Sequence, residues 1–123
     1  MLSKSTLAAF IATSKPEEAR KFYENVLGLT LISDEEYAIV FDANGTTLRV
    51  QKAAKFTPHP FTSLGWHIED IETAVAELRA KGVTFEQYPW MPEGSNGIMT
   101  FPEGARVAWF KDPDGNLLSL DQY

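Results

Sequence analysis

The stretch SKPEEARKFYENVLG, residues 14–28, predicts an amphipathic helix with a defined start and end. Ser14 and Glu17 have the spacing of a helix-capping pair, and Pro16 suits the first turn. Gly28 ends the segment, because glycine readily adopts the left-handed conformation at which helices stop. The apolar side chains between them recur at the spacing of one helical face: Ala19, Phe22, Tyr23, Val26 and Leu27.

The stretch DIETAVAELRAKG, residues 70–82, repeats this plan. Asp70 is the expected cap, and Gly82 ends the helix 54 residues after Gly28. A short apolar run of strand length precedes each helix, at residues 7–12 and 63–68. The strands expected after the helices are 29–33, 37–42 and 47–52 in the first half, and 83–87, 98–101, 106–110 and 117–121 in the second.

Each half is therefore interpreted as one β-α-β-β-β module of an α+β protein. The modules span about residues 1–54 and 61–123, joined by the proline-containing segment 55–60. A module of about 55 residues has too little interior to bury both a sheet and a helix alone. We therefore expect residues 1–123 to form a single domain.

Composition excludes several classes of protein. Hydrophobic residues make up 44% and charged residues 23%, as in ordinary globular proteins. The net charge of −6 disfavours nucleic acid as a partner, and no apolar run approaches the ~20 residues that span a membrane. The absence of cysteine excludes disulfides and thiol catalysis. With no recognisable signal peptide, a soluble cytoplasmic protein is expected.

Three segments occur together in an order that resembles the vicinal oxygen chelate superfamily. They are residues 22–29, 68–82 and 110–120. This superfamily includes glyoxalase I, bleomycin-resistance proteins, fosfomycin-resistance enzymes and extradiol dioxygenases. The resemblance implies two βαβββ modules whose sheets form an incomplete barrel around a small-molecule cleft, and it also implies a homodimer.

In enzymes of this superfamily, the resemblance further implies a divalent metal ion held by histidine and glutamate. The ligands lie on the first strand of each module and on the last strand. In this chain those positions are Ala8, Ser63 and Ser119, and residues 48–51 of the fourth strand contain no carboxylate. Alanine has no donor atom and neutral serine is a poor ligand for such ions. We therefore expect neither a metal nor another cofactor.

Period-two alternation along the strands selects the candidate ligand-binding side chains. His67 shares a face with Ser63 and Gly65, and we expect this face to line the cleft. His67 is the candidate acid–base catalyst, with a histidine satisfied by a neighbouring group as the alternative. The candidate ligand-binding residues are Phe10, Arg49, Gln51, Ser63, Trp90, Trp109, Ser119 and Asp121.

Arg49 is the one candidate with a permanent charge suited to a ligand oxygen. Its guanidinium would bind a carboxylate or polar oxygen of the ligand, and we place it opposite His67 across the cleft. An ion pair with Asp121 or Glu69 is the alternative. The loop 88–97 also leaves two interpretations open: Trp90 and Met91 form a lid over the cleft, or they fill an edge of the core.

Three functions are compatible with these residues. The favoured one is a metal-free protein that binds a flat or aromatic small molecule in an apolar pocket. The second is a glyoxalase-like lyase or isomerase, or a dioxygenase-type enzyme, that uses His67 and Arg49. The third is an enzyme with an unconventional metal site. One fold hosts many functions, so the fold alone does not decide among them.

The purified protein is expected to contain no stoichiometric divalent metal, because Ala8, Ser63 and Ser119 occupy the usual ligand positions. Elemental analysis after dialysis measures this directly. Retention of about one equivalent of zinc, nickel, manganese or iron would contradict the prediction and favour the third function.

Overall fold

The computed structural model describes residues 1–123 and divides the chain into two compact units, Met1–Thr57 and Pro58–Tyr123. The first unit contains a 3₁₀ turn at Leu2–Lys4, β1 (Ala8–Thr13), α1 (Pro16–Lys21), a π-helical turn at Phe22–Val26, β2 (Thr30–Asp34), β3 (Ala38–Ala43) and β4 (Thr46–Lys52). The second unit contains β5 (Leu64–His67), α2 (Ile71–Ala80), β6 (Ile98–Thr100), β7 (Arg106–Lys111) and β8 (Leu117–Gln122).

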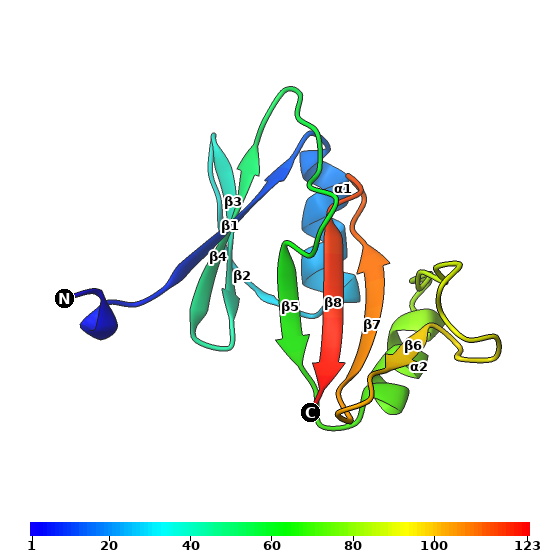
Figure 1. Ribbon diagram of the computed structural model, residues 1–123. Helices are drawn as coiled ribbons and strands as arrows, with labels where there is room; N and C mark the ends of the chain where they lie inside the picture. Colours follow the sequence, from blue (N-terminus) through cyan, green and yellow to red (C-terminus); the bar gives the residue numbers. More distant parts are fainter. The chain divides into compact units, whose positions relative to one another are not determined.

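Each unit builds one four-stranded mixed sheet, and the two sheets have the same strand order (Figure 1). The order is β1-β4-β3-β2 in the first unit and β5-β8-β7-β6 in the second. The first and last strands of each unit pair in parallel, and the other pairs are antiparallel. The expected α+β fold of two βαβββ modules is confirmed.

Alternation along the strands gives each sheet one strongly apolar face. In the first sheet this face carries Ile39, Phe41, Leu48 and Val50, none of which is more than 2% exposed. Tyr23, at the end of the first helix, packs against this face, and its ring lies 5.9 Å from that of Phe41. The helical segment is therefore held on its own sheet by an aromatic contact.

The first helix begins one residue later than expected. Pro16 opens α1 and Lys15 is its N-cap residue, so the prediction that Ser14 caps the helix is wrong. The Lys15 N–H donates to Thr13 Oγ1 at 3.0 Å, which satisfies that amide from the end of β1. Proline takes the first helical position because its fixed φ suits a helix and its missing N–H is not needed there. Gly28 ends the segment at a φ of +75°, as expected.

The second helix follows its sequence signals closely. The Asp70 carboxylate accepts hydrogen bonds from the Thr73 N–H at 3.2 Å and from the Thr73 hydroxyl at 2.8 Å. These bonds lower the pKa of Asp70, with the Thr73 hydroxyl the largest cause. Ile71 and Val75 are buried on the side of α2 that packs against β7 and β8. The predicted cap and apolar face are confirmed.

Residues 83–87 do not form the strand that their sequence predicts. Phe85 makes a single bridge to Phe110, and the Glu86 N–H donates to the Trp109 carbonyl at 2.8 Å. Strand β6 pairs with the beginning of β7, at residues 106–108, so only the end of β7 is open to residues 83–87. These residues make two backbone contacts there and form no strand, so the second module has four strands and not five.

The turns of the two hairpins rely on different chemistry. Asn44 and Gly45 have φ values of +51° and +93°, the left-handed pair that a tight hairpin requires. At residues 112–116, the buried Asp112 carboxylate organises the turn instead. It accepts hydrogen bonds at 2.9 Å from the Asp114 N–H, the Asn116 N–H and the Asn116 side-chain amide.

No helix of the structure combines the length and apolar character that crossing a bilayer requires.

Replacing Asp112 by alanine is expected to lower the free energy of unfolding by about 2–4 kcal/mol, because buried donors lose a charged acceptor. Asp112→Asn keeps one carbonyl acceptor and serves as the matched control with a smaller loss. Urea denaturation followed by circular dichroism measures both. Equal stability of Asp112→Ala and the wild type would show that the turn does not depend on this carboxylate.

Candidate functional site

One face of the second sheet carries the polar side chains that alternation predicted. We call this the Ser119 face, and its residues pair across the three strands β5, β8 and β7. Ser119 lies between Gly65 and Trp109, and Asp121 lies between His67 and Val107. The opposite face carries the buried core side chains that pack with α2: Ala108, Phe110, Leu118 and Leu120.

His67 and Asp121 form a pair on this face. His67 Nδ1 contacts Asp121 Oδ1, and the His67 ring lies 5.5 Å from the ring of Tyr123. The two partners differ in exposure: 81% for the His67 side chain and 17% for that of Asp121. A carboxylate accepts hydrogen bonds only, so it selects the tautomer with hydrogen on Nδ1. Nε2 then carries a free lone pair on the exposed side of the ring.

Ser119 lies in the adjacent row of the same face. The residue is 6% exposed, and its hydroxyl, which has no protein partner, is not fully buried. A Cβ atom at Gly65 would lie 2.8 Å from Ser119 Oγ, closer than carbon and oxygen tolerate. Glycine at position 65 therefore leaves the space that the serine hydroxyl occupies. The hydroxyl is a nearly buried polar group that still has a donor to offer.

Two aromatic rings adjoin Trp109, and together the three form what we call the aromatic cluster: Tyr88, Trp90 and Trp109. Trp90 stacks on Tyr88 with ring centroids 5.6 Å apart and planes inclined by 8°. Trp109 meets both rings edge-on, at 5.8 Å from Trp90 and 5.9 Å from Tyr88. Trp90 is 58% exposed, so the cluster presents a large aromatic surface.

The Tyr88 phenol stays protonated in this setting. Burial raises its pKa, and the charge of Glu86 acts in the same direction, whereas that of Lys111 opposes them. Tyr88 was not among the residues predicted as ligand contacts. Its position two residues before Trp90, in the same irregular loop, is the signal that would have indicated it.

The loop that carries Trp90 is tied down at both ends. Gln87 Oε1 accepts hydrogen bonds from the Ser95 hydroxyl and the Gly97 N–H, both at 3.1 Å. The Arg79 guanidinium donates to the Asn96 side-chain oxygen at 2.7 Å and to the Asn96 carbonyl at 2.9 Å. Loop 88–97 is therefore built as a fixed structure.

The two apolar residues of this loop have different environments. Met91 is 5% exposed, and the Tyr88 N–H donates to its sulfur at 3.3 Å. Met91 thus fills a space in the core, whereas Trp90 points outward. Met91 therefore fits the interpretation in which the loop fills an edge of the core, whereas the lid stays a prediction for Trp90.

The remaining predicted residues lie in three places. Ser63 precedes β5, and its N–H donates to the Leu117 carbonyl at 2.8 Å. Phe10 pairs with Arg49 in the first sheet, and Gln51 lies two residues further along β4 on the same face. Leu48 and Val50 are buried on the other face, as alternation predicted.

Arg49 forms an ion pair within the first unit. Its guanidinium lies 3.4 Å from the Glu35 carboxylate, in a partly exposed pair. A partly exposed pair of this kind contributes little to stability, so Arg49 can exchange its partner at small cost.

The donor atoms of the chain do not fit the metal site of the superfamily's enzymes. The three expected positions hold Ala8, Ser63 and Ser119. Within either unit, no three histidine, aspartate or glutamate side chains come together in an arrangement that holds a metal ion. The His67–Asp121 pair supplies two donors, and three or four are normally needed.

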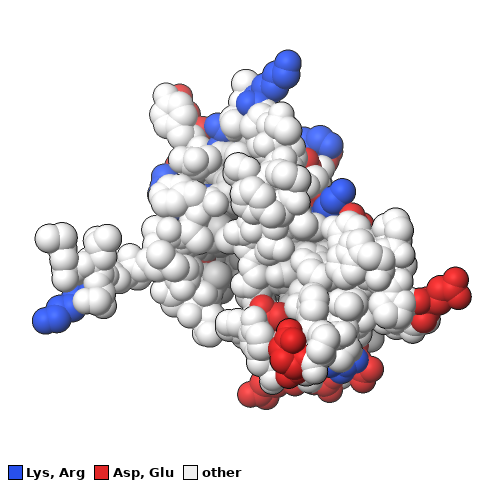
Figure 2. All heavy atoms as spheres, in the orientation of Figure 1, with Lys and Arg blue, Asp and Glu red and all other residues white.

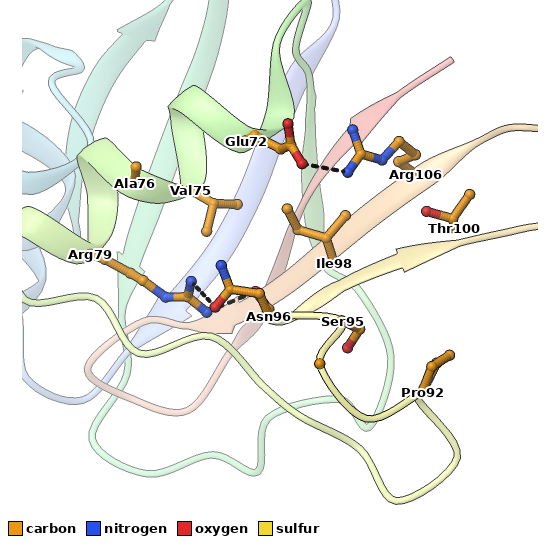
Figure 3. Close-up of a pocket in the computed structure, with 11 residues that line it drawn as sticks. Glu72, Val75, Ala76, Arg79, Pro92, Ser95, Asn96, Ile98, Thr100 and Arg106 are labelled. Carbon is orange, nitrogen blue, oxygen red and sulfur yellow. Dashed lines mark hydrogen bonds and ion pairs between the residues drawn. The ribbon is translucent and has the colours of Figure 1, made fainter.

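A separate hollow of about 800 Å³ lies between α2 and the segment 92–106 (Figure 3). Val75 and Ile98 form an apolar part of its wall. The charged groups around it have partners, since Arg106 lies 3.2 Å from Glu72 and Arg79 binds Asn96. Its polar groups thus stabilise the attachment of the loop to the helix.

On the face that Figure 2 presents, lysine and arginine are scattered among uncharged atoms. This distribution agrees with the net charge of −6.

Comparison with known proteins gives consistent matches. Residues 6–120 match the family model described as Glyoxalase/Bleomycin resistance protein/Dioxygenase superfamily. A virulence protein of Salmonella typhimurium is 29% identical over 112 residues, which cover 84% of this chain and 73% of that protein.

Solved structures agree with the family match. A superfamily member from Sphaerobacter thermophilus has a TM-score of 0.77 at 25% identity and full coverage of both chains. TnmS3, an antibiotic binding protein from a Streptomyces species, has a TM-score of 0.72 at 23% identity. That match covers 99% of this chain and 98% of the other, and it shows the fold alone.

The contact between positions 65 and 119 predicts a specific coupling. Gly65→Ala is expected to destabilise the protein by about 1–3 kcal/mol, as overpacking does, because the new methyl group meets Ser119 Oγ. Ser119→Ala removes that oxygen, so the double variant should recover most of the loss.

Thermal or urea unfolding of the wild type, both single variants and the double variant completes the cycle. Additive losses would show that the two positions do not touch in solution.

Proposed function

The chain belongs to the Glyoxalase/Bleomycin resistance protein/Dioxygenase superfamily, and we propose that it binds a small planar aromatic molecule without a metal ion. The observation that carries the proposal is the aromatic cluster of Tyr88, Trp90 and Trp109. Its most exposed member, Trp90, is stacked on Tyr88 and has no apolar cover on its outer side. Exposed aromatic surface of this kind commonly marks a binding site.

The physics of the cluster favours a flat ligand. An aromatic pair contributes about 0.5–1.5 kcal/mol beyond the area that it buries. The rings are held by one another and by the ties of loop 88–97, so little conformational entropy is lost when a ligand stacks on them. A rigid aromatic surface is therefore suited to planar molecules of varied substitution.

Polar groups next to the cluster supply orientation. The Ser119 hydroxyl is directly across from Trp109 and has no partner, and the His67–Asp121 pair lies one row further along the sheet. Pockets for small molecules combine apolar walls with a few placed polar groups. A ligand with one hydrogen-bonding substituent beside an aromatic ring matches this arrangement.

Residues of the first sheet belong to the proposal as additional ligand contacts. Phe10 is 54% exposed and shares a face with Arg49 and Gln51. Arg49 would exchange Glu35 for an acidic or polar oxygen of the ligand. A homodimer in the cytoplasm, with no nucleic-acid or membrane partner, completes the proposal.

The metal-free state is supported by chemistry of the side chains. The positions that hold metal in the enzymes carry alanine and serine, and the His67–Asp121 pair offers too few donors. TnmS3, which has the same fold, is described as an antibiotic binding protein. This places antibiotics among the molecules to be examined as ligands.

Two planar probes of opposite charge, 9-aminoacridine and anthraquinone-2-sulfonate, test the aromatic site. Trp90→Ala is expected to weaken binding of whichever probe binds by about two- to tenfold, since one stacking partner is lost. Isothermal titration calorimetry measures the dissociation constants.

Trp66→Phe is the matched control, because Trp66 pairs with Leu120 on the opposite face of the same sheet. Binding of neither probe, or an equal effect of the two substitutions, would contradict an aromatic site at Trp90.

A further inference from the structure

We propose that His67 is a general base that removes an acidic C–H proton from an arylmethyl ketone, in which one carbon separates the ring from the carbonyl, bound on the aromatic cluster. Asp121 is its positioning residue, and the Ser119 hydroxyl is the hydrogen-bond donor to the carbonyl oxygen. The inference rests on the proposed function, since it uses the same site. It adds a reaction and a substrate class to that site.

The His67–Asp121 pair has the form of an oriented base. Asp121 is mostly buried and binds the imidazole on Nδ1, whereas the rest of the ring is exposed. The carboxylate therefore fixes both the tautomer and the direction of the ring, and it leaves the Nε2 lone pair accessible. No other side chain hydrogen-bonds to either partner's side chain, so the pair is not part of a larger ion-pair network.

The Ser119 hydroxyl is suited to a developing negative charge on oxygen. It is 6% exposed, has no hydrogen-bond partner and lies beside the Cβ-free position of Gly65. Every fully buried side-chain oxygen or nitrogen has a partner, so this unpartnered hydroxyl reaches accessible space from which a ligand oxygen can approach it. Ser119 does not hydrogen-bond to His67, so the geometry is not that of a serine nucleophile.

Sheet geometry gives the spacing that a substrate must match. Trp109 and Ser119 are direct neighbours on adjacent strands, and His67 lies on the next strand, two residues along from Gly65. Adjacent strands are about 5 Å apart, and two residues along a strand span about 7 Å. A ring held on the aromatic cluster beside Trp109 would thus place its substituent over Ser119, with the adjoining carbon toward His67. A bicyclic arylmethyl ketone has these dimensions.

The proposed step is a reversible enolisation that needs no oxidant or reductant. His67 Nε2 takes a proton from the carbon between the ring and the carbonyl. The C–H electron pair becomes the new carbon–carbon double bond, and the carbonyl π pair moves to the oxygen, where Ser119 donates its hydrogen bond. Return of a proton from the imidazolium restores the ketone. In D₂O the returned proton is a deuteron, so the step appears as isotope exchange.

The test uses 2-tetralone, whose C1 protons lie between an aromatic ring and a carbonyl. In D₂O buffer, proton NMR should show C1–H exchange about tenfold or more faster with protein than with the same concentration of free imidazole. Cyclohexanone, which lacks the aromatic ring, should show no such gain. Exchange no faster than with imidazole would overturn the proposal.

Variants separate catalysis from binding. His67→Gln should abolish the gain while 2-tetralone still quenches tryptophan fluorescence, and His59→Gln is the matched control that should keep full exchange. Binding without accelerated exchange in the wild type overturns this inference and leaves the proposed function standing. Absence of both binding and exchange overturns both.

Asp121→Asn tests the positioning role, and its readout is the tautomer of His67, which a change in fold stability alone would not alter. The chain has two histidines, so nitrogen-15 NMR of labelled imidazoles resolves the His67 tautomer, with His59 as the internal reference. The wild type should carry its hydrogen on Nδ1. The asparagine amide donates to Nδ1 and should move that hydrogen to Nε2, with loss of exchange. An unchanged tautomer with lost exchange would remove Asp121 from the positioning role.

Discussion

Parallel pairing of the first and last strands of each module is the constraint on which the remaining structure depends. A parallel pair requires a crossover, and the helix in each module supplies it. This pairing brings residues far apart in the sequence into register, such as His67 with Asp121 and Gly65 with Ser119. Every polar feature of the Ser119 face thus follows from where β5 and β8 meet.

The aromatic cluster depends on a different kind of support. Trp90 lies in a segment without regular structure, where backbone hydrogen bonding does not fix side chains. Gln87 and Arg79 compensate by binding the loop through Ser95, Asn96 and Gly97. The Arg79 guanidinium also lies 5.4 Å from the centre of the Phe85 ring, which connects the loop to the core. Side-chain hydrogen bonds thus hold this loop in place, whereas backbone pairing holds the strands.

Sequence reasoning succeeded where a local rule acts alone. The turn at Asn44–Gly45, the Asp70 cap and the buried faces of β4 and β8 follow from backbone sterics, one hydrogen bond and period-two alternation. It failed where two local rules competed. Proline at position 16 displaced the expected Ser14 cap, and the strand-like residues 83–87 lost most of the β7 edge to β6.

The candidate site was predictable only in part. Alternation indicates which face carries Ser119, Asp121 and His67, because the side-chain period of a strand is two. It does not indicate that Arg49 pairs with Glu35, because Arg49 lies in β4 and Glu35 lies in the turn between β2 and β3, where alternation does not apply. Nor does it place Tyr88 against Trp90, because irregular loops have no period from which to reason.

The repeated sheet has an evolutionary consequence. Each module closes its own hydrogen-bonded sheet and buries its own apolar face, so the exposed face of one sheet is free to vary without disturbing the core of the other. After an internal duplication, selection can act on the two copies separately. One copy can exchange carboxylates for serine and tryptophan while its sister drifts. A scaffold of this kind can therefore change the chemistry of one face through a handful of substitutions on single strands.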